Sequence, residues 1–274
     1  MSYIGRPATS GSALTWSGSG FVFDTAIAGG GGGSAPERPP IDANHTHVWH
    51  MGAGCTTTGQ NILSDFGGVT LNRDFGSGSI QTGYSLFKSQ QSAYATQNTL
   101  GNPPSDNGWT SFAGSIPAIA TGSALTIEAI ALFPPESIGS VADYSGIVGL
   151  FNISVLNYAQ ITWKSSGIQP GFISQNPAFY NTQGTFGAGF GQVVPGMPTH
   201  LMFTWDPTIP RQQFYINGRL LTTNTDPTAG PRGQILDIIS VKFIAGGSIA
   251  DIRISNISRP QSYAIAATRA MRAL

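Results

Sequence analysis

The sequence of 274 residues is poor in charge: 13 Lys and Arg balance 13 Asp and Glu, and charged residues make up 9% of the chain. Soluble domains ordinarily carry about a quarter charged residues, so polar uncharged side chains and the backbone must keep this surface hydrated. Affinity for a phosphate backbone comes from Lys and Arg that displace counterions. Without basic clusters, nucleic acid is not an expected partner.

Cysteine and long apolar runs are also scarce. Cys55 is the only cysteine, so a disulfide within the chain is excluded and packing must stabilise the fold. No apolar run reaches the 18 or more residues of a membrane-spanning helix. The start, MSYIGRPATSGS, lacks the charge and apolar core of a signal peptide. We expect a protein that is made in the cytosol and has no membrane partner.

Glycine and proline are abundant, with 36 and 18 residues, yet 40% hydrophobic residues are enough for a core. After Pro40, short apolar runs alternate with turn residues, which is typical of an all-β domain. Residues 1–40 contain a run of five glycines and the stretch SAPERPP. They are predicted to form an N-terminal arm and linker, and residues 41–274 one large domain.

Individual strands are predicted by alternation. Residues 125–133 give the clearest strand, and in residues 200–206, HLMFTWD, one face is expected to be core and the other semi-exposed. Asn217-Gly218 between apolar runs predicts a tight hairpin, because both residues tolerate positive φ. The apolar spacing of residues 260–274 predicts a short C-terminal helix. Further strands are expected at 147–153, 158–164, 239–245 and 249–255.

The order TIEAIALFPP, PTHLMFTWDP, QQFYINGRLLTT and GGSIADIRISNISRP, followed by a short helix, resembles a laminin G-like, concanavalin A-like jelly-roll domain. The resemblance covers about residues 45 to 274, with Ile130 where the family commonly has tryptophan. It implies an all-β sandwich of two antiparallel sheets, to which the arm and the short C-terminal helix are added. This architecture serves lectins, glycan hydrolases, adhesion modules and virion proteins, so it implies a fold more than an activity.

The opening MSYIGRPA is similar to the starts of tailed-bacteriophage virion proteins. With the arm and the low charge, this resemblance implies a non-enzymatic virion structural protein that decorates the head or forms part of a tail or fibre. It would multimerise through the arm and contact its own copies and other virion proteins, in a virion assembled in the host cytoplasm. The residues expected to anchor the arm are Tyr3, Ile4, Trp16, Phe21 and Phe23.

Catalytic residues are not predicted. Glycan hydrolysis needs two carboxylates that face one glycosidic bond, whereas Glu128 and Asp251 each lack a second acid two or four residues away. Glu128 is expected instead to pair with an Arg or Lys, or to lie on a solvated strand face. A Ser-His-Asp triad is equally unsupported, since no Gly-x-Ser-x-Gly turn is present.

The most metal-like cluster is NHTHVWH, because the pattern His-x-His on a strand puts the imidazoles of His45 and His47 on one face. His50 has the opposite parity and no further ligand is near, so an ordinary polar face is the favoured interpretation. No cofactor is expected, and calcium is the one ion that the family resemblance leaves open. The candidate calcium ligands, all in loop-like contexts, are Asp65, Asp143 and Asp226.

Loop aromatics give an alternative function, because flat rings stack on the apolar faces of sugars. The segments DNGWTSF and NPAFYNTQG suggest loop positions for Trp109, Phe179 and Tyr180. The alternative is a carbohydrate-binding module that recognises a host-surface glycan, or another partner, through these three residues.

Overall fold

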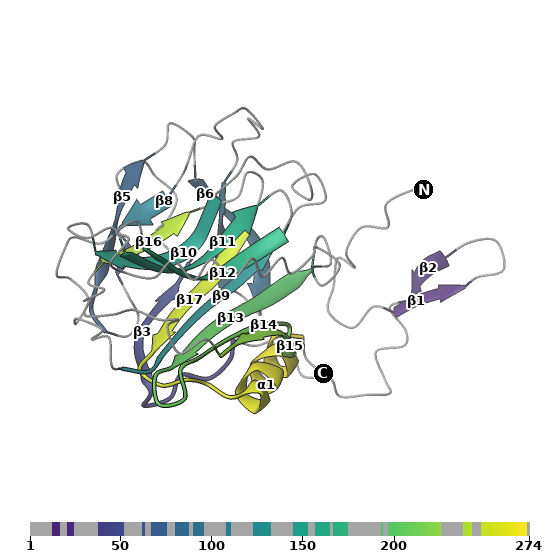
Figure 1. Cartoon of the computed structure of the whole chain (residues 1–274). Helices are drawn as coiled ribbons and strands as arrows, with labels where there is room; N and C mark the ends of the chain where they lie inside the picture. The colour runs from purple at the N-terminus through teal and green to yellow at the C-terminus, as the bar shows by residue number, and fades with distance from the viewer. Residues whose placement is uncertain are drawn as a thin grey trace.

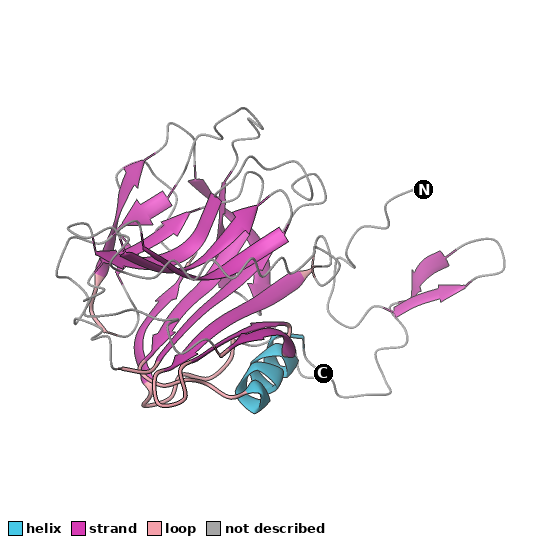
Figure 2. Cartoon of the chain, viewed as in Figure 1, coloured by secondary structure: helices cyan, strands magenta, loops and turns pink. Residues whose placement is uncertain are grey.

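A computed structural model of the chain places most of the described residues in β-strands (Figures 1 and 2). The structure describes residues 13–16, 21–24, 38–51, 62–63, 67–75, 80–87, 90–95, 108–110, 123–132, 145–152, 157–164, 167–174, 193, 197–225, 238–242 and 248–272. The elements are β1 (Ala13–Trp16), β2 (Phe21–Asp24), β3 (His45–His50), β4 (Ile62–Leu63), β5 (Thr70–Phe75), β6 (Ile80–Phe87), β7 (Gln90–Ala95), β8 (Gly108–Thr110), β9 (Leu125–Leu132), β10 (Ser145–Asn152), β11 (Asn157–Lys164), β12 (Gly167–Ser174), β13 (Pro198–Asp206), β14 (Arg211–Ile216), β15 (Arg219–Asn224), β16 (Ile238–Lys242), β17 (Ser248–Ser255) and α1 (Gln261–Arg272).

These strands form two large antiparallel sheets and one small one. The seven-stranded sheet has the order β12-β11-β10-β16-β8-β5-β4. The eight-stranded sheet has the order β15-β14-β13-β9-β17-β7-β6, with β3 paired to β17 beside this path. Strands β1 and β2 pair with each other in a separate hairpin. The two large sheets make a concanavalin A-like jelly-roll sandwich, which confirms the predicted fold class, including the short C-terminal helix.

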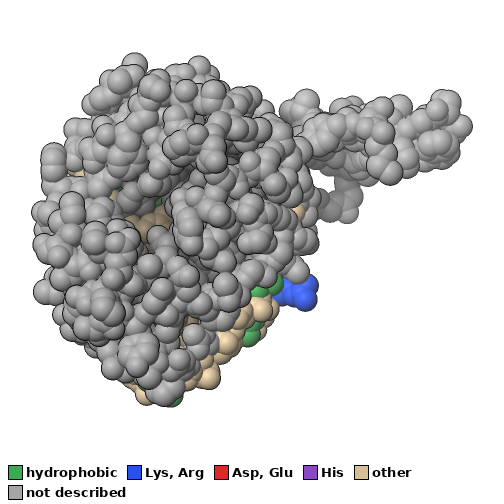
Figure 3. Space-filling model, turned by 45° about the horizontal axis from the view of Figure 1, so that its top comes forward, with side chains coloured by type: hydrophobic (Ala, Val, Ile, Leu, Met, Phe, Trp, Pro, Cys, Tyr) green, Lys and Arg blue, Asp and Glu red, His purple; other side chains and the backbone are tan. Residues whose placement is uncertain are grey.

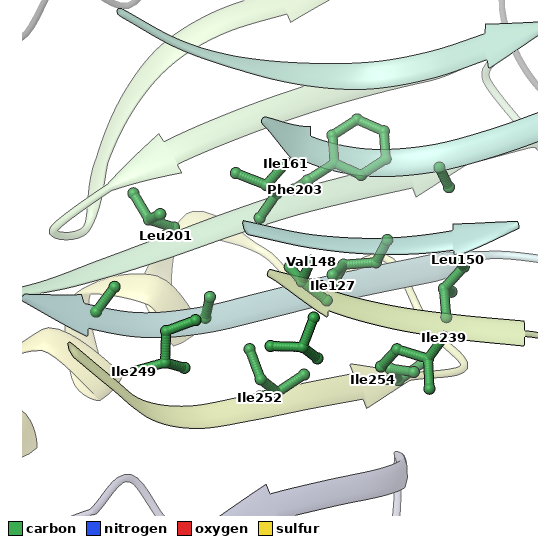
Figure 4. Packing of buried hydrophobic residues seen from close by; sticks show 14 of the residues in the cluster. Ile127, Val148, Leu150, Ile161, Leu201, Phe203, Ile239, Ile249, Ile252 and Ile254 are labelled. Atoms are coloured by element: carbon green, nitrogen blue, oxygen red, sulfur yellow. The ribbon is translucent and has the colours of Figure 1, made fainter. Parts of the chain in front are cut away.

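The main core lies between the two large sheets. It combines Ile127 and Phe203 of the eight-stranded sheet with Val148 and Ile161 of the seven-stranded sheet (Figure 4). Alternation explains this layer, because every second residue of a strand points to the same face. Burial of apolar side chains from both sheets stabilises the sandwich without a disulfide.

The other face of the eight-stranded sheet is also covered, so one prediction for β13 is wrong. All side chains from Thr199 to Trp205 are buried, including those on the face that was expected to be semi-exposed. Helix α1 packs against β13 and β15 on this face, where Met202 and Tyr215 contact Ala264. A sequence pattern within β13 could not reveal this cover, because the covering helix is distant in the chain.

Helix α1 follows Pro260, whose carbonyl oxygen accepts hydrogen bonds from the N–H groups of Tyr263 and Ala264 at 3.1 and 3.4 Å. Small side chains face the sheet: Ala264 and Ala267 are 0% and 3% exposed. They let the helix approach the strands closely, while Met271 packs on Ile130. The predicted C-terminal helix is therefore confirmed.

The predicted hairpin is also confirmed, and its turn lies under α1. Strands β14 and β15 are joined by Asn217 and Gly218, with φ of 51° and 78°. Positive φ at both central residues defines a type I′ turn. The N–H of Asn217 donates to the carbonyl oxygen of His200 at 2.8 Å, which fixes the turn to β13.

Replacing Gly218 by alanine should destabilise the fold by about 2–4 kcal/mol. The φ of 78° is unfavourable for a residue with a Cβ, and that Cβ would lie 2.9 Å from the Cα of Ile265 in α1. Gly68→Ala is the matched control, since Gly68 has a φ of 69° but open space around it; about 1–2 kcal/mol is expected there. Urea unfolding measures both, and equal losses would contradict a close approach of α1 to the turn.

Candidate functional site

Titratable side chains gather on the face of the eight-stranded sheet that α1 covers. We call this set the buried polar layer. Strand register explains the gathering, because Glu128 of β9 lies opposite Arg253 of β17, and Thr126 lies opposite Ser255. The members of the layer come from β3, β9, β13, β17, α1 and the segments before β3 and α1: Asp42, His45, Thr126, Glu128, His200, Asp251, Arg253, Ser255, Arg259 and Tyr263. All are buried except Asp42, which is exposed at the edge of the layer, and Tyr263, which is half-buried.

Asp251 is the centre of one half of the layer. Its carboxylate, 0% exposed, accepts hydrogen bonds from Arg38 Nη1 at 2.7 Å and from Arg253 Nη2 at 2.6 Å and Nε at 2.9 Å. Burial acts to lower the pKa of Arg253, but the charge of Asp251 outweighs this and raises it. Arg253 is therefore a permanently charged group inside the protein, compensated by a buried carboxylate.

The same arginines hold the chain that enters the sandwich. Arg253 Nη2 donates to the carbonyl oxygen of Pro39 at 2.7 Å and Nη1 to that of Pro40 at 3.3 Å. Arg38 Nη1 also donates to the carbonyl oxygen of Ala250 at 2.7 Å. Prolines lack an N–H and cannot join a sheet ladder as donors, so side chains of the sheet bind their carbonyl oxygens instead. We call residues 38–42 the anchor segment.

A second ion pair fixes the end of the anchor segment. Arg259 binds the carboxylate of Asp42 with both terminal nitrogens, at 2.5 and 2.6 Å. These hydrogen bonds hold the pKa of Asp42 well below its usual range. Arg259 also lies 4.2 Å above the ring centre of Tyr263 in α1, a cation–π contact. One guanidinium thus joins the anchor segment to the C-terminal helix.

Glu128 is bound by histidine rather than by the predicted Arg or Lys. His200 Nε2 donates to Glu128 Oε2 at 2.9 Å, and both side chains are 1% exposed. Burial acts to raise the pKa of Glu128, but the hydrogen bond and charge of His200 and the charge of Arg253 outweigh it, so the pKa is lowered. Glu128 is a buried carboxylate and does not lie on a solvated face.

His45 is held in one tautomer. The backbone N–H of Asp42 donates to its Nδ1 at 3.0 Å, so we assign the proton to Nε2, which lies 3.2 Å from the hydroxyl oxygen of Tyr263. Burial lowers the pKa of His45, as do the charges of Arg259 and Arg253. Burial also raises the pKa of Tyr263, and the Glu128 carboxylate adds to that rise.

His45 and His47 do not share a face, contrary to the expectation from His-x-His. The pairing of β3 with β17 shifts between these residues, at a β-bulge. His47 stacks on Trp49 of the main core, with ring centres 5.5 Å apart, whereas His45 contacts Tyr263 on the opposite face. A bulge adds one residue and breaks the two-residue alternation, which separates the two imidazoles.

No group of three or more His, Cys, Asp or Glu side chains that could hold a metal ion occurs among the described residues. His50 lies 3.5 Å from Asp251, a carboxylate already bound by two arginines. The calcium candidates Asp65, Asp143 and Asp226 lie outside the described residues. Calcium binding therefore remains a prediction.

The loop prediction for Trp109 is wrong. Trp109 lies on β8, between β5 and β16, where it is paired with Arg73 and Val241. Phe179 and Tyr180 lie outside the described residues, as do Tyr3 and Ile4. The other predicted arm residues, Trp16, Phe21 and Phe23, are on the hairpin β1–β2.

The buried polar layer contains acids and bases that are used for internal contacts. Glu128 and Asp251 are 1% and 0% exposed; His200 binds Glu128 Oε2, and Arg38 and Arg253 bind the two oxygens of Asp251. On the face drawn in Figure 3, the visible described atoms include a basic side chain beside hydrophobic ones, with no acidic side chain or histidine among them. Neither carboxylate can reach a glycosidic bond in this arrangement.

Sequence reasoning missed most of this layer. Asp42, His200 and the pair Arg259 and Tyr263 come from three distant parts of the sequence, and only the fold brings them together. One local signal was available: Asp251 and Arg253 alternate with isoleucines in IADIRIS, which places both on one strand face. Opposite charges at such positions inside an apolar strand indicate a buried pair.

Comparisons with solved structures find the same fold in toxin binding domains. The binding domain of Paraclostridial Mosquitocidal Protein 1 has a TM-score of 0.53 and 13% identity, over 82% of this chain and 52% of that chain. The botulinum neurotoxin serotype G binding domain has a TM-score of 0.52 and 10% identity, over 82% of this chain and 50% of that chain. The serotype D binding domain has a TM-score of 0.54 and 8% identity, over 82% of this chain and 51% of that chain.

This chain spans about half the length of those binding domains. At such low identity the likeness shows the fold alone, a β-sandwich of the kind that these binding domains contain. Neither protein-family models nor curated protein sequences give a match. Among the described residues, no helix has the length and apolar character needed to cross a membrane.

Asp251→Asn should destabilise the protein by about 3–5 kcal/mol, because it leaves the buried Arg253 without its carboxylate. Asp206→Asn is the control. That acid pairs with Arg211 at 3.6 Å on the surface, and about 0–1 kcal/mol is expected. Urea unfolding gives both values, and a loss at Asp251 no larger than at Asp206 would contradict the central role of this carboxylate.

Stability should also fall as the pH drops below about 6.5. Burial lowers the folded-state pKa of both His45 and His47 from 6.5. Between the folded pKa and 6.5 the unfolded chain binds more protons, so this stabilisation is complete above 6.5 and is lost on acidification. Thermal unfolding from pH 7.5 to 5 measures the slope. His47→Phe should reduce that slope whatever its effect at pH 7.5, and an unchanged slope would exclude His47 as a source.

Proposed function

We propose that this chain is a non-enzymatic structural subunit of a tailed-bacteriophage virion, on the head or in a tail or fibre. It joins its neighbours through the residues before the sandwich. Its location is the virion, assembled in the host cytoplasm, and its partners are its own copies and other virion proteins. The proposal needs no cofactor.

One observation carries this proposal: the chain enters the sandwich through an anchor segment that forms ion pairs with two buried side chains of the sandwich. Arg38 and Asp42, at the two ends of the segment, bind Asp251 and Arg259. An attachment made by residues 1–37 would therefore be coupled directly to the central strand β17 and to the segment before α1. A subunit that must stay attached in an assembly benefits from such a connection, because peeling the segment away exposes unpaired buried charges.

Three further observations support a structural role. The acids Glu128 and Asp251 are buried and contact side chains inside the protein rather than a substrate. Charged residues are 9% of the sequence, and the cores of protein interfaces are depleted in charge. The opening MSYIGRPA resembles the starts of phage virion proteins.

A phage in which residues 1–37 are deleted from this protein tests the proposal. Virions should lack the truncated protein, detected by immunoblot of purified particles, although the sandwich still folds with an unchanged melting temperature. A deletion of residues 1–12 alone, which keeps β1 and β2, is the matched comparison for the hairpin. Full incorporation of the 1–37 deletion, or virions with normal stability and adsorption without the protein, would refute the proposal.

A carbohydrate-binding module is the second candidate, favoured by the fold shared with toxin domains described as receptor-binding. Trp109 is on a strand, so Phe179 and Tyr180 are the remaining loop-aromatic candidates. A glycan array distinguishes this candidate: reproducible binding that Phe179→Ala with Tyr180→Ala abolishes would support it. Both activities are compatible in a fibre tip.

A further inference from the structure

Two hydrogen-bond donors converge on one nitrogen of His45, at the end of the anchor segment. The backbone N–H of Asp42 donates to Nδ1 at 3.0 Å, and Arg259 Nη2 lies 3.1 Å from the same atom. Arg259 is also the side chain that binds the Asp42 carboxylate. The unprotonated Nδ1 of this imidazole, which is 0% exposed, is therefore an acceptor that holds the end of the anchor segment against the sandwich.

The formal charges of the described residues around His45 are balanced when the imidazole is neutral. Three arginines face three carboxylates in the buried polar layer and its contacts with the anchor segment: Arg38, Arg253 and Arg259 against Asp42, Glu128 and Asp251. Three other titratable side chains face these groups: His50 beside Asp251, His200 bound to Glu128, and Tyr263 beside His45. A proton on His45 adds a positive charge that this arrangement does not compensate.

We propose that protonation of His45 releases the anchor segment from the sandwich, so that acid loosens the connection to residues 1–37. Both ring nitrogens of a protonated histidine are donors. The N–H of Asp42 and Arg259 Nη2 would then both point at another N–H group, and the new charge would lie beside a guanidinium. This device goes beyond the proposed function, because it acts whatever residues 1–37 bind.

Two carboxylates oppose this effect without cancelling it. Asp42 Oδ1 lies 3.0 Å from Nδ1, and Glu128 Oε1 lies 3.9 Å from Nε2. The Asp42 side chain is 44% exposed, so solvent screens its charge, and its oxygens already accept hydrogen bonds from Arg259. Burial has the largest effect on His45, and with the charges of Arg259 and Arg253 it lowers the pKa of the imidazole. The closed anchor segment therefore favours neutral His45.

Polar contacts, rather than apolar burial, hold the anchor segment. Pro40, Ile41 and Asp42 are exposed, so their release uncovers little apolar surface. Arg253 binds the carbonyl oxygens of Pro39 and Pro40, and Arg259 binds the Asp42 carboxylate. Segments with few buried apolar contacts open locally at a lower free energy than the core. The attachment thus depends on hydrogen bonds and charges, which a proton on His45 alters directly.

His47 gives a matched comparison in the same strand. It is also buried, and burial lowers its pKa. It stacks on Trp49 of the main core, on the face of β3 opposite to the one from which His45 contacts Tyr263. Protonation of His47 should therefore weaken the sandwich as a whole rather than the anchor segment alone.

Amide hydrogen exchange of the full chain, followed residue by residue by NMR from pH 7.5 to 5, tests the proposal. The probes are the amides of Asp42 and Asn44, which donate to His45 Nδ1 and to Asp42 Oδ1. Corrected for intrinsic rates, both should be less protected than the amides of β9 at every pH. Their protection should fall at least threefold by pH 5, toward a limit of about thirtyfold for a histidine whose pKa is 6.5 when the segment is open.

His45→Asn is the decisive variant, because an amide oxygen can accept the N–H of Asp42 in place of Nδ1 and does not titrate in this range. The fall in protection at Asp42 and Asn44 should disappear in this variant. The control is His47→Phe, which should reduce the pH dependence of the β9 amides and leave the fall at Asp42 and Asn44 unchanged.

Any of four results would overturn the proposal. Two come from the unmodified chain: anchor amides as protected as those of β9, which would open only with the whole sandwich, or anchor protection that is the same at pH 7.5 and pH 5. The others are a fall that persists in His45→Asn and a fall that His47→Phe removes. Three of these measurements do not need His45→Asn, so the test stands even if that variant does not fold.

Discussion

The carboxylate of Asp251 is the constraint on which much of this sandwich depends. It is fully buried and binds two guanidinium groups, one from its own strand and one from Arg38, at the start of the anchor segment. Two cations beside one anion leave excess positive charge, and Glu128 lies across from Arg253 in the neighbouring strand. Placing Arg253 between the two acids balances charges that would be very unfavourable if isolated in an apolar interior.

This balance has a consequence for the outer face of the eight-stranded sheet. An open polar face would hydrate its charges, but here α1 and the anchor segment exclude water from them. The covering elements then supply polar partners from Arg38, Asp42, Arg259 and Tyr263. The layer therefore specifies where two segments dock, a role best attested for buried polar groups that select one arrangement.

Local patterns predicted the parts of the fold that depend on neighbouring residues. The Asn217-Gly218 turn, the strand at 125–133 and the C-terminal helix each follow from a few consecutive side chains. The predictions failed where distant segments or a bulge decide the outcome. Burial of Met202 depends on α1, and the separation of His45 from His47 requires one extra residue in β3. The alternation of apolar and polar residues along a strand predicts neither the covering helix nor the bulge.

The location of the acids also restricts where this protein can act. A fold shared with toxin binding domains is compatible with ligand binding on many surfaces, but the face under α1 is occupied by internal contacts. Any contact with a partner must then use other surfaces or the residues before Arg38. Of these, the chain before Arg38 continues into the anchor segment, whose Pro39 carbonyl oxygen Arg253 of β17 binds. Any load placed on the chain before Arg38 would therefore be transmitted to β17 and to the start of α1 through Asp251, Arg253 and Arg259.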